Sequence, residues 1–225
     1  MKRSKPTVAI DGPAGSGKST VARMLAKRLA FTHIDTGALY RGVALLALRN
    51  KVSLDDESAV VAAASKCKME FHQLPDGNLL HIDGENVNKE IRTEQVSQAS
   101  SKVSAFPRVR ALLLGLQREL GKDGGIVLEG RDIGTVVFPD AEVKIFLTAS
   151  IEARAKRRTL ELATKGAVVD LDRVKTEMAQ RDKQDSERPI SPLMQAPDAV
   201  LVDTSTLSIE SVLDHLESIV RDRSR

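Results

Sequence analysis

The chain has 225 residues, of which 41% are hydrophobic and 29% are charged, as in an ordinary soluble protein. This length allows one full α/β domain with a buried core and an insertion. The formal net charge is only +3, no Lys/Arg block of five or more occurs, and one Tyr, five Phe and no Trp offer few stacking platforms. The composition therefore weighs against nucleic acid and favours anionic small molecules as partners.

Cysteine usage and apolar runs point to a cytoplasmic enzyme. Cys67 is the single cysteine of the sequence, so we expect no disulfide framework and no metal cluster. The start, MKRSKP, is basic, but only the short run TVAI follows it, unlike a signal peptide. The apolar run at 43–48 is far too short to cross a bilayer, so no membrane partner is expected. A monomer is the expected state.

The first predicted elements are a strand, a glycine-rich loop and a helix. Val8–Ile10 is a short apolar run typical of a buried parallel strand, and Val21, Leu25 and Leu29 recur at helical spacing. Between them, residues 12–19 fit the spacing G-x-x-x-x-G-K-[ST] of the phosphate-binding loop (P-loop). An ordinary glycine-rich turn is the alternative, but the flanking strand and helix favour nucleoside-triphosphate binding.

Each residue type in the loop has a chemical reason. The glycines let backbone N–H groups approach a phosphate at a helix N-terminus. Lys18 supplies a point charge for the β- and γ-phosphates, and the Ser19 hydroxyl is the expected Mg²⁺ ligand. The residues expected to bind ATP are Gly12, Pro13, Ala14, Gly15, Ser16, Gly17, Lys18, Ser19 and Thr20.

A second strand is predicted at 31–35, followed by a helix through Leu48. This junction puts Thr36, Tyr40 and Arg41 at the carboxyl end of a strand, where doubly wound sheets bind ligands. Arg41 could clamp a second phosphate through two parallel hydrogen bonds. We interpret His33 as a packed strand residue.

The pattern then changes to that of a small antiparallel sheet. A helix is predicted at 54–64, with Ser53 as its N-cap. Apolar residues alternate at 66–74 and 79–82 and a third segment follows at 87–91, with turns at 75–78 and 83–84. We interpret residues 65–95 as an inserted, substrate-side subdomain.

The remaining strands complete a parallel sheet. Residues 94–120 are predicted helical in two pieces, broken at Pro107, with Ser104 capping the second piece. Arg108 and Arg110 oppose the dipole of that piece, which indicates either a surface position or a bound anion or base edge. Further strands are predicted at 124–129, 143–147 and 199–202, and a closing helix at 208–220. Five apolar strands separated by helices predict an α/β domain of P-loop type with a parallel sheet covered on both faces.

Residues 151–190 form a charged helical region. Arg154, Arg157 and Arg158 share one helix face, and Arg181, Asp185 and Arg188 share another before Pro189. Such a pattern usually means a solvated, salt-bridged face. The phosphate loop favours a catalytic meaning here, because phosphoryl transfer needs several guanidinium groups.

These residues resemble the bacterial cytidylate kinases (CMP kinases) over nearly the whole chain. The matching segments are IDGPAGSGKST, DTGALYRGVA, EIRTEQVS, SAFPRVR, EGRDIGTVVFPDA, KIFLTAS and RDKQDSERPISPL. The P-loop is shared by many families, whereas FPRVR, GRDIGTVVFPDA and RDxxDxxR are more specific. The resemblance implies a five-stranded parallel sheet, an NMP-binding insertion at 65–95 and a lid at 151–190. It also implies transfer of the γ-phosphoryl group of ATP to CMP or dCMP with Mg²⁺.

The resemblance further implies roles for individual residues. Tyr40, Arg41, Arg131 and Arg188 would hold the CMP phosphate near Thr36; Ser101, Arg110 and Asp132 would read cytosine; Arg181 and Asp185 would contact the ribose; Arg154, Arg157 and Arg158 would lie on the lid. The implied catalytic residues are Lys18, Arg131, Arg158 and Arg188. Two departures are visible: Thr36 replaces a common Ser, and Glu129 stands where Asp is usual, which puts its outer-shell role towards Mg²⁺ in question.

Two other functions fit the loop. One is a small P-loop kinase for a different nucleotide or a metabolite. The other is a nucleotide-dependent switch or DNA-associated ATPase. That class needs a water-positioning residue and often an N/TKxD base-reading motif, which the sequence lacks.

Overall fold

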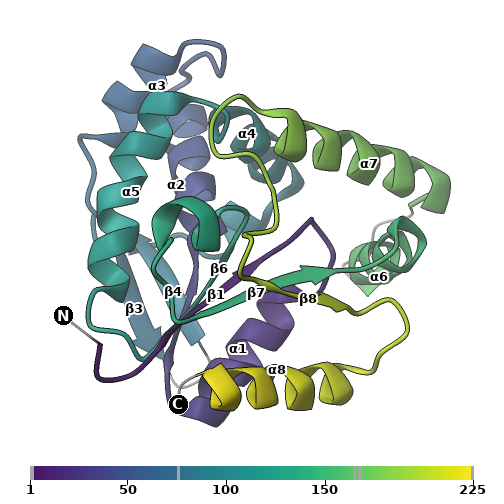
Figure 1. Cartoon of the computed structure of the whole chain (residues 1–225). Coiled ribbons are helices and arrows are strands. Elements are labelled where there is room, and N and C mark those ends of the chain that lie inside the picture. The colour runs from purple at the N-terminus through teal and green to yellow at the C-terminus, as the bar shows by residue number, and fades with distance from the viewer. Residues whose placement is uncertain (1–2, 75–76, 165, 167–168, 224–225) are drawn as a thin grey trace.

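Five parallel strands form the central sheet, in the spatial order β2-β6-β1-β7-β8 (Figure 1). The computed structural model describes residues 3–74, 77–164, 166 and 169–223. The strands span Thr7–Asp11 (β1), Thr32–Asp35 (β2), Ile126–Gly130 (β6), Val143–Thr148 (β7) and Val200–Asp203 (β8). The predicted five-stranded parallel sheet is therefore confirmed.

Helices α1 (Lys18–Leu29) and α8 (Ile209–Arg223) cover one face of this sheet (Figure 1). Side chains of a strand point alternately to its two faces. Val8 and Ile10 therefore pack on α1 and α8, against Leu25 and Leu216, whereas Ala9 faces the opposite side. This alternation fixes which residues of each strand lie beneath the first turn of α1.

The opposite face packs against α5 (Pro107–Gly121) and a π-helical turn, η2 (Ile133–Val137). Ala9, Leu128 and Ile133 belong to this core. In η2 the Phe138 N–H donates to the Ile133 carbonyl at 2.7 Å, five residues back. π-helical turns are rare in proteins overall, and those that occur are often found at functional sites. Here the turn directly follows β6.

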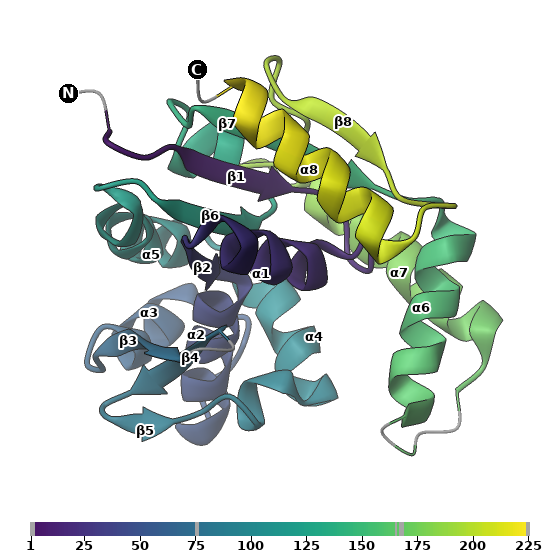
Figure 2. The ribbon, with the colours of Figure 1, turned by 90° about the horizontal axis from the view of Figure 1, so that it is seen from below.

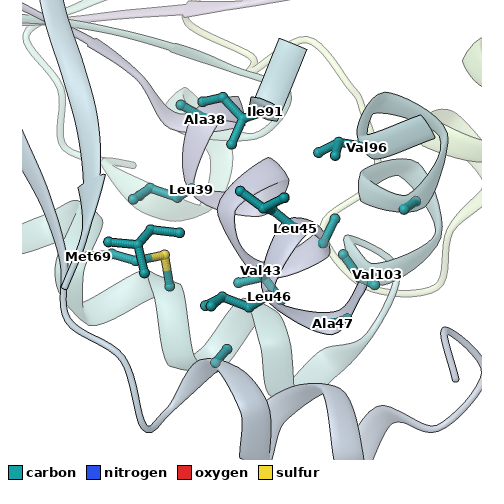
Figure 3. Close-up of a cluster of buried hydrophobic side chains, with 14 of the residues drawn as sticks. Ala38, Leu39, Val43, Leu45, Leu46, Ala47, Met69, Ile91, Val96 and Val103 are labelled. Carbon is teal, nitrogen blue, oxygen red and sulfur yellow. The ribbon is translucent and has the colours of Figure 1, made fainter. Parts of the chain in front are cut away.

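The segment between β2 and β6 builds a second layer with its own core (Figure 3). It contains α2 (Thr36–Arg49), α3 (Glu57–Ala64), β3 (Met69–Leu74), β4 (Gly77–Ile82), β5 (Glu85–Asn86), the 3₁₀ turn η1 (Glu90–Arg92) and α4 (Glu94–Val103). The three strands form an antiparallel sheet in the order β3-β4-β5. Leu39 and Val43 of α2 pack against Met69 of β3 and Val103 of α4. The predicted antiparallel insertion is therefore present.

The pattern allows an antiparallel sheet of two or three strands, and a third strand at 87–91 is not what the structure contains. The third strand is β5, only two residues long, and the chain then turns into η1. Val87 and Ile91 are both buried, and the Ile91 N–H donates to the Val87 carbonyl at 3.0 Å, as in a helical turn. Two apolar side chains four residues apart reach the same core from one turn, so no extended segment is needed. Pro75 and Asp76 of the predicted first turn lie outside the described residues.

Two predicted helix caps are also wrong. Helix α3 begins at Glu57, and its N-cap is Asp56, whose carboxylate accepts from the Ala59 N–H at 3.0 Å. Asp and Ser cap about equally well, so Ser53 had a competitor three residues later. Helix α5 has Phe106 at its N-cap with Pro107 as its first residue. Because Pro has a fixed φ and no N–H, it begins this helix instead of only ending the preceding one.

Helices α6 (Ile151–Thr164) and α7 (Leu171–Glu187) form a hairpin that projects from the body (Figure 2). They share a small core of Ala155, Val174 and Met178. Because this core is small and mostly separate from the others, the hairpin is held to the sheet by polar contacts described below. Among the described helices, none combines the length and hydropathy that crossing a membrane requires.

Candidate active site

The P-loop follows β1, and its glycines are needed by the geometry. Gly12 has φ 148°, and a Cβ there would lie 2.0 Å from the Leu147 carbonyl oxygen of β7. Gly15 has φ 74° and would place a Cβ 2.7 Å from Met178 of α7. A side chain at Gly12 would press on the backbone of β7, whereas one at Gly15 would displace the flexible end of the Met178 side chain and crowd Arg154. The loop backbone thus runs in close contact with both β7 and the α6–α7 hairpin.

Lys18, the first residue of α1, curls back over the loop. Its Nζ donates to the Pro13 carbonyl at 2.7 Å and to the Ser16 hydroxyl at 3.3 Å. Burial, and after it the neighbouring Arg131 guanidinium, lower the pKa of Lys18 well below its usual range. A nearby anion would reverse this shift, because opposite charge favours the ammonium form. The surroundings of Lys18 therefore favour a bound anion.

Two arginines of α6 hold the outer side of the loop. Arg154 is buried and donates to the Ala14 carbonyl at 3.1 Å, while it pairs with Asp182 of α7 at 2.6 Å. Arg157 donates to the hydroxyl of Thr204 at 3.0 Å, and that hydroxyl donates to the Ser16 carbonyl at 3.1 Å. These two side chains join the α6–α7 hairpin to the P-loop backbone in this structure.

Ser19 and Glu129 form the part of the site that fits a magnesium ion. The Ser19 hydroxyl donates to Glu129 Oε2 at 2.7 Å, and Glu129 Oε1 lies 3.0 Å from His33 Nε2. Across the described residues, no cluster of three or more His, Cys, Asp or Glu could form a metal cage. Mg²⁺ in kinases needs no such cage, because it keeps several waters and binds through one or two protein oxygens plus substrate phosphates. This donor pair fits that mode.

The sequence reasoning missed Asp11, the last residue of β1. Its two carboxylate oxygens accept the N–H groups of Ile133 and Gly134 at 2.8 and 2.7 Å, and so hold the start of η2. Burial raises the pKa of Asp11 to about 6, against the opposing effect of these two hydrogen bonds. The only available signal was its position directly before the first glycine of the P-loop motif.

A second group of charges gathers where β2 and β6 end. Arg41 pairs with Asp35 at 2.5 Å, and the Thr36 hydroxyl donates to the Glu129 carbonyl at 2.8 Å. Burial alone would raise the pKa of Asp35, but the Arg41 guanidinium outweighs it and holds that pKa below its usual value. Arg41 is therefore already held by an ion pair near the end of β2, which is separated from the P-loop strand β1 by β6.

Arg110 and Asp132 form a buried ion pair. The Arg110 guanidinium also lies 5.3 Å from the centre of the Tyr40 ring. The other oxygen of Asp132 lies 3.9 Å from Arg188 Nη2. Burial, and then the charge of Arg110, lower the pKa of Arg188. Residues from α2, α5, the β6–η2 turn and the end of α7 therefore meet here.

A third ion pair joins α7 to the sheet. Arg131 donates from Nε to Asp185 Oδ2 at 2.8 Å. Burial would raise the pKa of Asp185, but Arg131 outweighs it and holds the pKa below its usual value. Burial, and then repulsion by Arg131, lower the pKa of Arg181 to about 10. The guanidinium charge here exceeds what Asp185 balances, a condition that favours binding an anion.

Several buried guanidinium nitrogens in this cluster have no hydrogen-bond partner: Arg41 Nε, Arg110 Nε, Arg181 Nε and Arg188 Nη2. Buried polar atoms in proteins are almost always satisfied, so these nitrogens point to a missing acceptor. Oxygens of a phosphate or a nucleoside would supply one.

Two predicted site residues, Ser101 and Arg158, contact side chains outside the charged cluster described above. Ser101 of α4 donates to the Gln184 side chain of α7 at 3.3 Å. Arg158 of α6 pairs with Glu94 at 3.1 Å and Glu161 at 2.9 Å, at a partly exposed position. The structure thus brings Lys18, Arg131, Asp185 and Arg188 together, and leaves Arg158 bridging α6 to α4.

Comparisons with known proteins agree with this arrangement. A model of the cytidylate kinase family matches residues 8–222. A cytidylate kinase of Geobacillus sp. (strain WCH70) is 49% identical over 221 residues, 98% of this chain and 99% of that protein. One of Carboxydothermus hydrogenoformans is 51% identical over 213 residues, 95% of this chain and 96% of that protein.

A solved structure shows the same fold at low identity. It is an uncharacterized protein from Eubacterium ventriosum, with a TM-score of 0.54 and 11% identity over 96% of this chain and 99% of that one. This likeness concerns the fold alone. The family match and the two relatives cover nearly all of the chain, which therefore belongs to the cytidylate kinase family.

Proposed function

We propose that this protein transfers the γ-phosphoryl group of ATP to CMP and dCMP, giving ADP and CDP or dCDP, with Mg²⁺. One observation carries the proposal: β1 and β6 are neighbours in the parallel sheet, with Asp11 opposite Gly130, so the P-loop with Lys18 and the turn with Arg131 leave adjacent strands at the same end. Two phosphate-binding groups thus share one site, as transfer between two phosphates requires. The family's name supplies the acceptor.

The donor is ATP in this proposal. Its β- and γ-phosphates lie against the N–H groups of residues 12–20 and the Lys18 ammonium. Bound Mg²⁺ would supply neutralising charge on the β- and γ-oxygens, held through the Ser19 hydroxyl with Glu129 behind it. Because Lys18 is buried, its charge acts in a weakly screening environment on the transferring group.

The acceptor nucleotide lies on the other side of Arg131. Arg41, Arg131 and Arg188, with Tyr40 and Thr36 nearby, hold its phosphate. Arg41 Nε and Arg188 Nη2 are buried N–H groups that lack acceptors in this structure. Asp132, Arg110 and Ser101 face the cytosine base, and Arg181 with Asp185 faces the ribose. Contacts that do not depend wholly on the 2′-hydroxyl would allow dCMP beside CMP.

The subdomain and lid assignments belong to the same proposal. Residues 65–95, the antiparallel sheet with the following turn, form the NMP-binding insertion, and residues 151–190 form the lid. The small separate core of the α6–α7 hairpin suits movement as a unit. Closure keeps water from the γ-phosphate, so that ATP is not hydrolysed. In the closed form Arg158 joins the catalytic arginines. A cytoplasmic monomer is part of this proposal.

An acceptor screen with ATP and Mg²⁺ tests the function. We expect phosphoryl transfer to CMP and dCMP to exceed transfer to UMP, AMP and GMP by roughly 10³-fold in kcat/KM. Little ADP should form without an acceptor. A preference for another nucleotide or for a metabolite would replace the acceptor assignment, and acceptor-independent hydrolysis would indicate an ATPase or a switch.

A further inference from the structure

We infer that His33 is a positioning residue: its ring holds the Glu129 carboxylate against the Ser19 hydroxyl, and thereby orients that hydroxyl towards the metal site. The inference rests on the proposed function, in that it concerns the same P-loop and its Mg²⁺. It departs from the interpretation of His33 as a packed strand residue. The contacts that carry it are the 2.7 Å hydrogen bond from Ser19 to Glu129 and the 3.0 Å contact from Glu129 to His33.

The sheet register puts the three residues together. β2 and β6 are parallel, with Asp35 opposite Glu129 and His33 opposite Val127. Val127 belongs to the core beneath α1, so Glu129, two residues on, faces the same side. Ser19 lies in the first turn of α1, above the end of β6. On this face of β6, the apolar Val127 is therefore followed by the carboxylate of Glu129, and α1 lies above both.

Each oxygen of the carboxylate has one side-chain donor. Oε2 accepts from Ser19, and Oε1 faces His33 Nε2. A carboxylate only accepts, so Nε2 carries the ring proton in this contact. The Glu129 side chain is 4% exposed and the His33 side chain 12%, so both partners of this contact are largely buried. Removing the His33 donor would leave one buried carboxylate oxygen without that bond and free to turn away.

The position of this carboxylate matters because of what Ser19 must do. While the Ser19 hydroxyl donates to Glu129, its lone pairs point away from the carboxylate and are available to a metal. Partners behind a metal ligand commonly fix its orientation. Glu has one more methylene than the Asp usual at this place, hence one more rotatable bond. His33 supplies the restraint that the longer side chain lacks.

The surroundings of His33 argue against simple core filling. Beyond its contact with Glu129, His33 lines an open pocket of about 470 Å³, whose wall also includes Arg23, Phe31 and Leu74. The His33 ring thus lies between a carboxylate and a pocket. Its hydrogen bond to Glu129 gives it a polar contact that a side chain serving only to fill a core does not need.

The test separates metal binding from packing. Titration calorimetry would measure Kd for a non-hydrolysable ATP analogue with Mg²⁺ and with EDTA instead. In His33→Phe, which keeps a ring but has no donor, we expect the Mg²⁺-dependent gain in affinity to fall roughly 10-fold, the low end for partners behind a metal ligand. The Kd without metal should stay within about twofold. His33→Gln, which can still donate, should recover most of the gain.

The same His33 substitution in a Glu129→Asp variant tests whether His33 acts through Glu129. In Glu129→Asp the shorter carboxylate no longer reaches both neighbours, so adding His33→Phe should cost no further metal-dependent affinity. His215→Leu, at an exposed histidine of α8, is the matched control and should bind as the parent does. Should His33→Phe not fold, His33→Leu gives the same donor-free comparison.

Two results would overturn the inference. One is an equal loss with and without Mg²⁺, which is what damaged packing produces. The other is the same loss from His33→Phe in the parent chain and in the Glu129→Asp variant. No acceptor is present in these titrations, so they remain decisive about His33 even if the acceptor screen rejects CMP.

Discussion

Asp132 is the residue on which the choice of cytosine over uracil should depend. Cytosine offers an N4 amino group and acceptors at N3 and O2, whereas uracil offers an O4 acceptor and an N3–H donor. A carboxylate accepts only and a guanidinium donates only, so Asp132 and Arg110 would suit cytosine and oppose uracil. Both side chains are less than a tenth exposed, so a mismatch could not be relieved by water.

The magnitude follows from this burial. Leaving a buried, charged acceptor facing another acceptor costs on the order of several kcal/mol. At 1.4 kcal/mol per decade, about 4 kcal/mol corresponds to roughly 10³-fold preference for CMP over UMP in kcat/KM. Asp132→Asn keeps the shape and can donate an amide N–H to uracil O4. We therefore expect the CMP/UMP ratio to narrow by about 10²-fold or more.

The assay compares kcat/KM for CMP and UMP in each variant. Asp132→Asn also removes charge beside Arg110 and Arg188, but that loss weakens both acceptors alike, so the ratio is the informative quantity. Asp182→Asn is the matched control. It breaks the ion pair between Asp182 and Arg154 in the α6–α7 hairpin and should leave the CMP/UMP ratio unchanged. If the ratio is also unchanged in Asp132→Asn, the carboxylate only pairs with Arg110 and shapes the turn after β6.

Three further predictions concern Lys18, the Asp185–Arg131 ion pair and the lid. Lys18→Ala should lose about 10²-fold or more in kcat, measured in steady state, while the fold survives, because Lys18 acts on the transferring group; near-normal turnover would contradict this role. Asp185→Asn should lower the free energy of unfolding by about 3 kcal/mol at pH 7, because it leaves Arg131 unpaired in a buried place. Since Arg131 lowers the pKa of Asp185, this contribution exists above the unfolded value of 3.8 and is lost as the pH falls below it; urea titrations should show the deficit shrinking at low pH, and a pH-independent deficit would refute the charge argument. Small-angle scattering should show compaction when CMP and a non-hydrolysable ATP analogue bind together, and an unchanged radius of gyration would count against a mobile lid.

The sequence predicts well those features that local pattern determines. The P-loop, the five strands and the antiparallel insertion could be found because each depends on spacing within about ten residues. The 87–91 segment shows the limit of this approach. Its buried pair, Val87 and Ile91, is compatible with a strand or with one helical turn, and the core beside α2 selects the turn.

Contacts between distant segments were beyond the reach of local pattern. Asp11 binds N–H groups 122 and 123 residues away, and Glu129 meets a histidine 96 residues earlier. Nothing near these residues in the sequence marks the contact. The family resemblance could name Arg131, Asp132 and Asp185 as site residues. It could not say that in the absence of ligand each of them is already in an ion pair.

Ion pairs with carboxylates explain how several arginine side chains can be held in fixed positions in one site. Arg41, Arg110, Arg131 and Arg154 each pair with a carboxylate, respectively Asp35, Asp132, Asp185 and Asp182. An arginine presents five donors, so one edge can stay on its carboxylate while other N–H groups turn to a substrate oxygen. The carboxylates thus hold the arginines in place before a nucleotide binds. The entropic cost of ordering these side chains is therefore incurred during folding and not during binding. A lysine concentrates its charge on one nitrogen at the end of a flexible stem, so it does not offer two separate edges in a fixed geometry. The four arginine–carboxylate pairs around this end of the sheet use that difference.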